Sequence, residues 1–299
     1  MGVFEKLVLG VLPLVPKPIM RPVAQRYVAG EELEDALGKL RTLAGAGYSG
    51  IIDILGEDVE GEAQAREVLA EYRRAADGVH ATGLEAYVSV KPTHFGLRTS
   101  EELALGLYRE LAAYCQGLGL FLRVEMEDHS TTEATLRIFE ALRADHQNTG
   151  LVLQSRLLRT PQDIAALAPG PLSVRMVKGI YLEPADIAHT AADDIRDAFL
   201  ACARQLFERG AYVSLATHDD LLAERLLALI AELGLGPDRY EFQVLLGVQE
   251  PLWAKWREGG HPVRVYVPFG PEWLPYSLRR LRKNPEILRH VVRATLRLG

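Results

Sequence analysis

Cysteine is scarce in this sequence. Cys115 and Cys202 are the only two in 299 residues, they lie far apart, and neither belongs to a CxxC pair. Both fall in helical patterns, where a small buried apolar side chain is the usual role of cysteine. We therefore expect neither a disulfide framework nor a zinc knuckle, and we take the cytoplasm as the default compartment.

Long apolar runs are also missing. Hydrophobic residues make up 48% and charged residues 25% of the chain, and no segment approaches the roughly 18 apolar residues needed to span a bilayer. The apolar start, residues 3–14, contains Lys6 and Pro13 and shows no small-residue cleavage site. We interpret residues 1–29 as a segment packed on the domain, with peripheral contact at the inner membrane face as the alternative.

The chain has no excess of basic residues and no common metal-binding pattern. With 34 Lys and Arg against 40 Asp and Glu, the net charge is −6, which repels polyanions, so no nucleic-acid partner is expected. Neither HxH nor HExxH spacing occurs, and we expect no metal site.

The sequence does contain an alternation of short β-rich runs with longer helical patterns, which is typical of βα units on a parallel sheet. Eight runs are nearly continuous apolar strings, as buried parallel strands require. They span residues 48–55, 84–91, 120–126, 150–154, 172–178, 211–217, 240–245 and 263–267. Eight strands close a barrel, and about 250 residues suffice for one. We predict a single (β/α)8 TIM-type barrel domain over residues 1–299.

Amphipathic helices separate these strands. They are predicted over residues 63–82, 101–118, 132–145, 193–209 and 220–234, with an extra N-terminal helix at 30–44. Capping residues agree with these bounds: Ser100 and Thr160 at helix starts, and Gly83, Gly210 and Gly234 after helix ends. A basic helical region, residues 276–299, follows the last strand and is predicted to cover the barrel mouth.

One glycine motif needs rejecting. Gly45, Gly47 and Gly50 satisfy G-x-G-x-x-G, but the dinucleotide-binding form of this pattern requires a strand before it and a helix after it. Here a helical pattern precedes the motif and the strand follows, so we predict a helix-to-strand turn.

Polar residues gather at the predicted strand ends. In a barrel these ends converge on one mouth, where the chemistry sits, while apolar layers fill the interior. The set comprises Glu57, Lys91, Glu125, Glu127, Asp128, Gln154, Arg175, Lys178, Thr217, His218, Asp219, Glu241, Gln243 and Tyr266. Lys91 and Lys178 could act as a Schiff-base nucleophile, as in barrel aldolases, or could stabilise a bound cofactor electrostatically.

Four longer strings at these strand ends resemble the proline dehydrogenase family. They are VRMVKGIYLEP at 174–184, ATHD at 216–219, EFQVLLG at 241–247, and VRVYVPFG with WLPYSLRRL within 263–281. The resemblance runs from about residue 27 to the C-terminus. It implies a flavin-dependent oxidoreductase that takes a hydride from the carbon beside the nitrogen of L-proline or a related small amino acid, giving 1-pyrroline-5-carboxylate from proline. A quinone or another acceptor would then reoxidise the flavin.

The resemblance also implies residue roles. FAD, held noncovalently at the barrel mouth, would contact Gln154, Arg175, Val177, Lys178, Gly179, Tyr181, Thr217, His218 and Gln243. The substrate pocket would comprise Lys91, Asp128, Leu245, Tyr266, Tyr276, Arg279, Arg280 and Lys283, with Glu57 as a gate paired to the first arginine. An arginine fork grips a carboxylate at two points, and residues 276, 279, 280 and 283 share one helical face.

Several positions depart from the family pattern. Lys283 stands where a glutamate is usual, and Leu246, Arg156, Ile180 and Pro92 also differ. Three alternatives therefore stay open at the level of sequence: a related flavoenzyme that oxidises a different amine or N–N-containing acid, a Schiff-base aldolase, and a catalytically inactive binding barrel.

Overall fold

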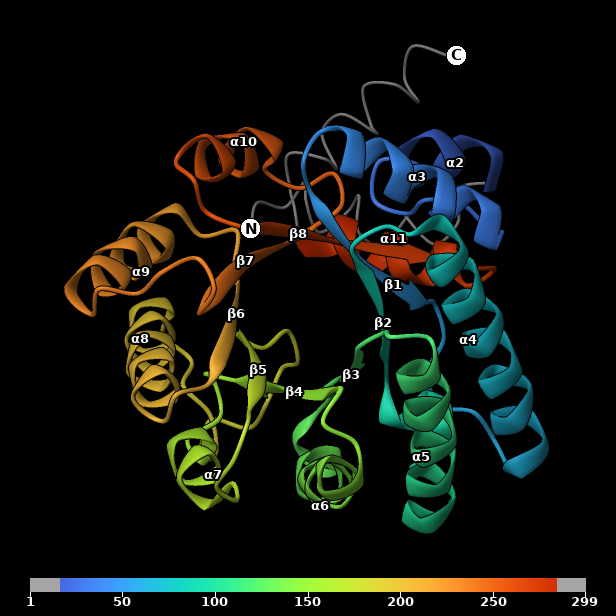
Figure 1. The fold of residues 1–299 in the computed structure, drawn as a ribbon, viewed down its shortest axis with the longest axis horizontal. Helices are drawn as coiled ribbons and strands as arrows, with labels where there is room; N and C mark the ends of the chain where they lie inside the picture. The colour runs from blue at the N-terminus through green and yellow to red at the C-terminus, as the bar shows by residue number, and fades with distance from the viewer. Residues whose placement is uncertain (1–16, 284–299) are drawn as a thin grey trace.

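The fold is a closed barrel of eight parallel strands, each hydrogen-bonded to its neighbours in chain order (Figure 1). The structure is a computed structural model that describes residues 17–283, without the side chains of residues 17–19, 23 and 279–283. The strands are β1 (Ser49–Ile54), β2 (Ala86–Val90), β3 (Leu122–Val124), β4 (Thr149–Gln154), β5 (Ser173–Val177), β6 (Tyr212–Ala216), β7 (Tyr240–Leu245) and β8 (Val263–Phe269). The predicted (β/α)8 barrel is confirmed.

Helices form an outer ring around the strands (Figure 1). They are α2 (Lys17–Ala24), α3 (Leu33–Gly45), α4 (Glu62–Thr82), η2 (Pro92–Phe95), α5 (Glu101–Gly117), α6 (His129–Asp145), α7 (Thr160–Ala166), α8 (Ala192–Glu208), α9 (Asp220–Glu232), α10 (Glu250–Glu258) and α11 (Trp273–Lys283). The main apolar core fills the layer between this ring and the strands.

The helix ends follow the predicted capping chemistry with one exception. The Ser100 hydroxyl accepts the Leu103 N–H at 3.2 Å, and Gly83, Gly210 and Gly234 all have positive φ after helix ends. Thr160 is instead the first residue of α7, and its hydroxyl donates to the Gln154 carbonyl at 2.5 Å. This bond ties α7 to the end of β4.

The GAGYSG segment is the predicted helix-to-strand turn. Helix α3 ends at Gly45, Gly47 has φ of 82°, and β1 begins at Ser49. Gly50 lies inside the strand, paired with Ala86 and Val265. A Cβ at Gly50 would meet a Leu40 methyl at 2.1 Å, so this glycine lets α3 pack closely on the strand.

The barrel interior is polar, so the expectation of apolar interior layers was wrong. Arg123 on β3 is fully buried, and its guanidinium reaches the Ser214 hydroxyl on β6 at 3.4 Å. Because β3 and β6 are not neighbours, this bond must cross the lumen. Gly150 makes room for it, since a Cβ there would meet Arg123 Nη1 at 2.4 Å. Hydrogen bonds to the Leu151 carbonyl at 3.2 Å and the Ser173 carbonyl at 3.0 Å compensate for the burial of this guanidinium.

Helices α2 and α11 pack together over the end of β1. A second apolar cluster contains Met20 and Tyr27 from the α2 region, Leu55 after β1, and Trp273 and Tyr276 from α11. The C-terminal helix therefore starts at Trp273, three residues earlier than predicted, and residues 284–299 lie outside the description. None of the described helices is long and apolar enough to cross a membrane.

Candidate active site

Lys91 stands at the end of β2 among four carboxylates. Its ammonium donates to the Gly56 carbonyl at 3.0 Å, so it also fastens the start of the β1–α4 loop. Burial alone would lower the pKa of Lys91, but Asp53, Glu57, Glu127 and Glu125 together raise it above its ordinary value. The lysine is therefore a fixed cation in an anionic environment.

Asp53 on β1 is the most deeply buried of these carboxylates. Burial raises its pKa to about 6, against the lowering effects of Lys91, a hydrogen bond from Tyr266, and Arg175. Among the described residues, its Oδ1 atom has no hydrogen-bond partner. Asp53 was absent from the predicted site, and it gives the site an acceptor atom that is not yet used.

Arg175 on β5 connects the two sides of the lumen. It forms an ion pair with Glu125, the residue after β3, and its Nε donates to Gln243 on β7 at 2.5 Å. Its guanidinium lies 5.3 Å from the centre of the Tyr266 ring. Burial would raise the pKa of Glu125, but Arg175, Ser89 and Lys91 hold it below its ordinary value.

Glu127, after β3, is held by a single residue from the β2 end. The Thr93 N–H donates to one carboxylate oxygen at 2.9 Å and the Thr93 hydroxyl to the other at 2.8 Å. Burial nevertheless raises the pKa of Glu127 to about 7. The Gln154 side-chain amide donates to the backbone carbonyl of Glu127 at 2.7 Å. A predicted cofactor residue therefore helps to fix the backbone of Glu127.

Lys178 and His218 occupy the opposite side of the mouth. Lys178 and Arg196 both pair with Asp219, the second at 2.8 Å. Partial burial raises the pKa of Asp219, but these cations and the Leu222 N–H bring it down to about 2. His218 Nε2 accepts the Leu245 N–H at 2.9 Å, so a neutral ring carries its proton on Nδ1.

The β5–α8 loop begins with a glycine that the site requires. Gly179 has φ of 97°, and a Cβ there would come within 2.8 Å of the Gln154 side-chain oxygen. The Arg156 guanidinium donates to the Tyr181 carbonyl, while its buried Nε has no partner in the described part of the chain. Val177 is the last residue of the adjoining strand β5, and Thr217 follows the end of β6. The predicted cofactor residues thus share one side of the mouth.

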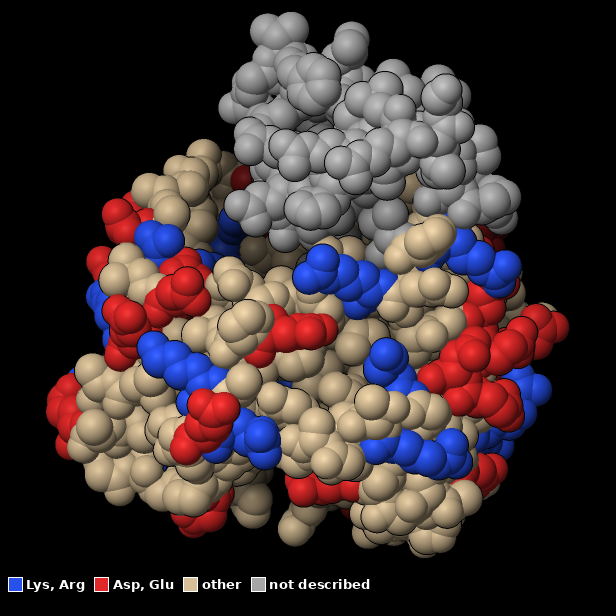
Figure 2. Space-filling view, turned by 90° about the horizontal axis from the view of Figure 1, so that it is seen from above, with Lys and Arg blue, Asp and Glu red and all other residues tan. Residues whose placement is uncertain are grey.

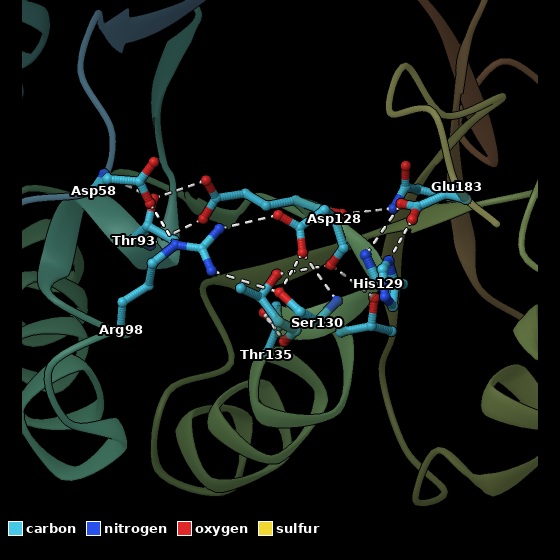
Figure 3. A network of polar contacts seen from close by, with 12 residues as sticks. Asp58, Thr93, Arg98, Asp128, His129, Ser130, Thr135 and Glu183 are labelled. Atoms are coloured by element: carbon cyan, nitrogen blue, oxygen red, sulfur yellow. Dashed lines mark hydrogen bonds and ion pairs between the residues drawn. The ribbon is translucent and has the colours of Figure 1, made fainter.

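Asp128 does not join the Lys91 cluster, contrary to the prediction. It caps α6 by accepting the Ser130 N–H at 2.9 Å, and it pairs with Arg98 at 3.0 Å (Figure 3). Its carboxylate is therefore engaged at the start of α6 and by Arg98. Of the carboxylates that follow β3, Glu125 and Glu127 are the ones that act on Lys91.

Figure 3 shows Arg98 between Asp128 and Asp58, the residue that follows the predicted gate Glu57. Glu57 lines a cavity of about 560 Å³ beside the mouth, together with His94, Pro271 and Pro275. Burial lowers the pKa of His94 to about 4, so this histidine is neutral. Neither Lys91 nor Asp53 lines the cavity, which therefore adjoins the reactive cluster without containing it.

Helix α11 carries the remaining predicted substrate residues. Tyr276 is buried in the cluster between α2 and α11. Arg279, Arg280 and Lys283 belong to the α11 backbone, but their side chains lie outside the described residues. Among the other departures, Leu246 packs in the main apolar core and Ile180 is half exposed.

Asp53, Tyr87, Thr93 and Arg98 were not identified as site residues from the sequence. A usable signal was present: inward polar residues recur with period two along the strands, as strand geometry requires. Tyr87, Ser89 and Lys91 follow this spacing, as do the next inward sets, Arg123–Glu125–Glu127 and Glu241–Gln243. Thr93 lies in the short helix η2 and Arg98 in the loop that follows it, beyond the end of β2, where strand periodicity does not apply.

The outer surface carries charges of both signs, and Figure 2 shows Lys and Arg interspersed with Asp and Glu over one face. Within residues 17–283, no group of three or more His, Cys, Asp and Glu side chains is placed to hold a metal ion.

The fold and the mouth together define a (β/α)8-barrel enzyme whose buried acidic and basic groups meet at the strand ends. The sequence matches the family described as proline dehydrogenase over residues 36–293. It is 33% identical to the proline dehydrogenase of Deinococcus radiodurans over 92% of this chain and 90% of that protein. Proline dehydrogenase 1 of Bacillus subtilis strain 168 is 31% identical over 92% and 91% respectively. The chain belongs to the proline dehydrogenase family, oxidoreductases that act on CH–NH donors.

Solved structures share the fold. Proline utilization A from Bdellovibrio bacteriovorus, in a form inactivated by N-propargylglycine, superposes with a TM-score of 0.84 at 21% identity, over 92% of this chain and 36% of that one. Family membership argues against both the aldolase and the inactive-barrel alternatives. Lys91 agrees with this, because neighbouring carboxylates raise the pKa of its ammonium group, and Lys178 is engaged in an ion pair with Asp219.

Proposed function

We propose that this chain oxidises L-proline to 1-pyrroline-5-carboxylate with FAD as its cofactor, and that a quinone or another acceptor receives the electrons. One observation carries the proposal: the barrel mouth holds two adjoining polar sites of opposite character. Carboxylates dominate around Lys91, and cationic and amide groups dominate around Arg175 and Lys178. The first suits a substrate amine, and the second suits a polyanionic cofactor.

The residues on the cationic side fit FAD. Lys178 and Arg156 Nε, which has no partner among the described residues, offer donors for phosphate oxygens, and Gly179 leaves the backbone accessible where a side chain would clash. We assign Gln154, Arg175, Val177, Lys178, Gly179, Tyr181, Thr217, His218 and Gln243 to this cofactor site. When bound there, FAD supplies the acceptor for the hydride that leaves the carbon beside the substrate nitrogen.

The residues on the acidic side would bind and deprotonate the amine. Proline oxidation removes one N–H proton as well as the hydride, and Asp53 Oδ1 is a buried acceptor without a partner among the described residues. Tyr266 orients Asp53 by a hydrogen bond, and the charge of Lys91 lowers the pKa values of Asp53 and Glu125 against the effect of their burial. By resemblance, Arg279 and Arg280 would grip the substrate carboxylate, and Glu57 would gate it.

Proline is favoured over a different amine because the departures from the family pattern do not converge on Lys91. Leu246 lies in the apolar core, Ile180 is half exposed, and Pro92 is buried in η2. Lys283 alone stays open, since its side chain lies outside the described residues.

The visible spectrum of the purified protein tests the proposal, followed by anaerobic addition of L-proline in the same cuvette. We expect flavin absorption bands that bleach with proline. Flavin that stays oxidised with proline but bleaches with another amino acid would overturn the assignment of proline as the substrate. A colourless protein that also fails to take up added FAD would overturn the assignment of FAD as the cofactor.

A further inference from the structure

Thr93 joins two parts of the mouth that are distant in sequence. Its hydroxyl donates to Glu127 at 2.8 Å and accepts the Asp58 N–H at 3.1 Å. Its backbone bonds Glu127 again and the next residue of the loop: the N–H donates to Glu127 at 2.9 Å, and the carbonyl accepts the Val59 N–H at 3.2 Å. Thr93 is fully buried, so water does not compete for these bonds.

The segment bound by Thr93 carries the gate candidate. Glu57 lies between Gly56, whose carbonyl accepts from Lys91 at 3.0 Å, and Asp58, which is bonded to Thr93. Asp58 has φ of 54°, a left-handed conformation that costs energy for a residue other than glycine. The bonds from Lys91 and Thr93 on either side of Glu57 hold the loop in this conformation.

Glu127 is the partner that Lys91 and Thr93 share. Lys91 acts on it electrostatically, and Thr93 bonds both of its oxygens. The other titratable groups that face Glu127 are Glu57 in the loop, Tyr108 on α5 and Tyr181 after β5. An exposed bridge outside, from Arg98 to Asp58 and Asp128, reinforces the same loop (Figure 3).

We propose that Thr93 is a positioning residue of the reaction: one hydroxyl, bonded to both Glu127 and the β1–α4 loop, holds Glu57 and Lys91 in register at the barrel mouth. This assignment rests on the proposed oxidation of proline. Thr93 touches neither substrate nor cofactor in it, and it acts through Glu127 and the loop.

Thr93→Val tests the assignment, because valine keeps the shape of threonine and removes only the hydroxyl. We expect kcat/KM for proline to fall about 10-fold or more, mostly through KM, since the buried Glu127 carboxylate and the part-buried Asp58 N–H each lose a partner. The acidic limb of the pH profile should move to higher pH, because the hydroxyl lowers the pKa of Glu127. Thr93→Ser, which restores the hydroxyl, should recover both properties.

Thr135→Val is the matched control. Thr135 is fully buried on α6, and its hydroxyl donates only to the Thr131 carbonyl, at 2.8 Å. This variant loses a comparable internal hydrogen bond, so it reports the effect of reduced stability alone. Its KM and the position of the acidic limb of its pH profile should match those of the wild type.

Amide hydrogen exchange tests the hold on the loop without any turnover. The Asp58 N–H should exchange faster in Thr93→Val than in the wild type, Thr93→Ser or Thr135→Val. A Thr93→Val protein that matches Thr135→Val in KM, acidic limb and exchange would overturn the inference. Wild-type protein that fails to oxidise proline would overturn the proposed function instead, and the exchange rates would still decide whether Thr93 fixes the loop.

Discussion

The two sides of the barrel mouth differ in how completely their charges are paired. On the side of β5 and β6, Asp219 is shared by Lys178 and Arg196, and its pKa falls to about 2. On the side of β1 to β3, the pKa of Asp53 is raised to about 6 and that of Glu127 to about 7. One side has enough cations for its carboxylates, and the other does not.

This difference indicates two kinds of occupant. A site with its charges already paired is preorganised and suits a resident cofactor. A site where buried carboxylates outnumber cations is stabilised when a cationic group arrives, which suits a substrate amine that enters and leaves. Arg175 belongs to both sides, because it pairs with Glu125 and bonds Gln243.

Arg175→Met should give the largest effect, since it breaks the connection between the two sides. Glu125 would remain as a buried anion without its main partner, at a cost of about 3–5 kcal/mol. We expect a large drop in thermal stability, loss of bound flavin and no measurable proline oxidation. Thermal unfolding and the flavin-to-protein absorbance ratio measure these changes.

Arg225→Met is the control for Arg175→Met. Arg225 pairs with Asp197 at 2.6 Å on the exposed outer surface, and such pairs contribute about 0–1 kcal/mol. If Arg175→Met kept its flavin and unfolded at the same temperature as Arg225→Met, the buried ion pair would not connect the two sites.

Lys91→Met should impair the acidic side of the mouth and leave the cofactor side unchanged. It removes the cation of the acidic side, and we expect kcat/KM for proline to fall about 100-fold. Flavin content should stay close to that of the wild type, because the predicted cofactor residues keep their partners. Lys255→Met, on the exposed face of α10, controls for loss of charge. Loss of flavin in Lys91→Met would mean that the two sites are not separable.

The amino-acid sequence predicts the barrel well and its interior poorly. Eight apolar runs suffice for the strand order, because only a closed parallel sheet buries all of them. Lys91, Arg175 and Gln243 were predicted to lie at the mouth, and they do. Asp53 was overlooked as a single charge in an apolar run, although its position in the period-two pattern places it inside.

Loop residues were harder to assign. Asp128 and Glu127 are adjacent in the sequence, but one caps α6 at the rim while the other points to Lys91. The choice depends on where the strand ends, and strand bounds shift by a residue or two between sequence pattern and structure. Thr93 shows no sequence signal at all, because its role comes from hydrogen bonds between separate loops.

Glu127→Gln should give the smallest effect, a change in how stability depends on pH. The folded protein raises the pKa of Glu127 from its ordinary value of 4.5 to about 7, so it favours the protonated form. The carboxyl group therefore stabilises the fold fully below about pH 4.5, and this contribution is lost as pH rises through about 7. Glutamine does not titrate, so the variant lacks this loss.

Between about pH 5 and about pH 8, the unfolding free energy of the wild type should therefore fall relative to that of Glu127→Gln, by on the order of 2 kcal/mol. Urea unfolding at the two pH values measures it, and the constant cost of replacing the carboxylate cancels in the comparison. Asp219, with its pKa lowered to about 2, stays ionised at both pH values and contributes nothing to this difference. An equal difference at both pH values would mean that Glu127 is ionised in the fold as readily as in water, and that the acidic side is not short of cations.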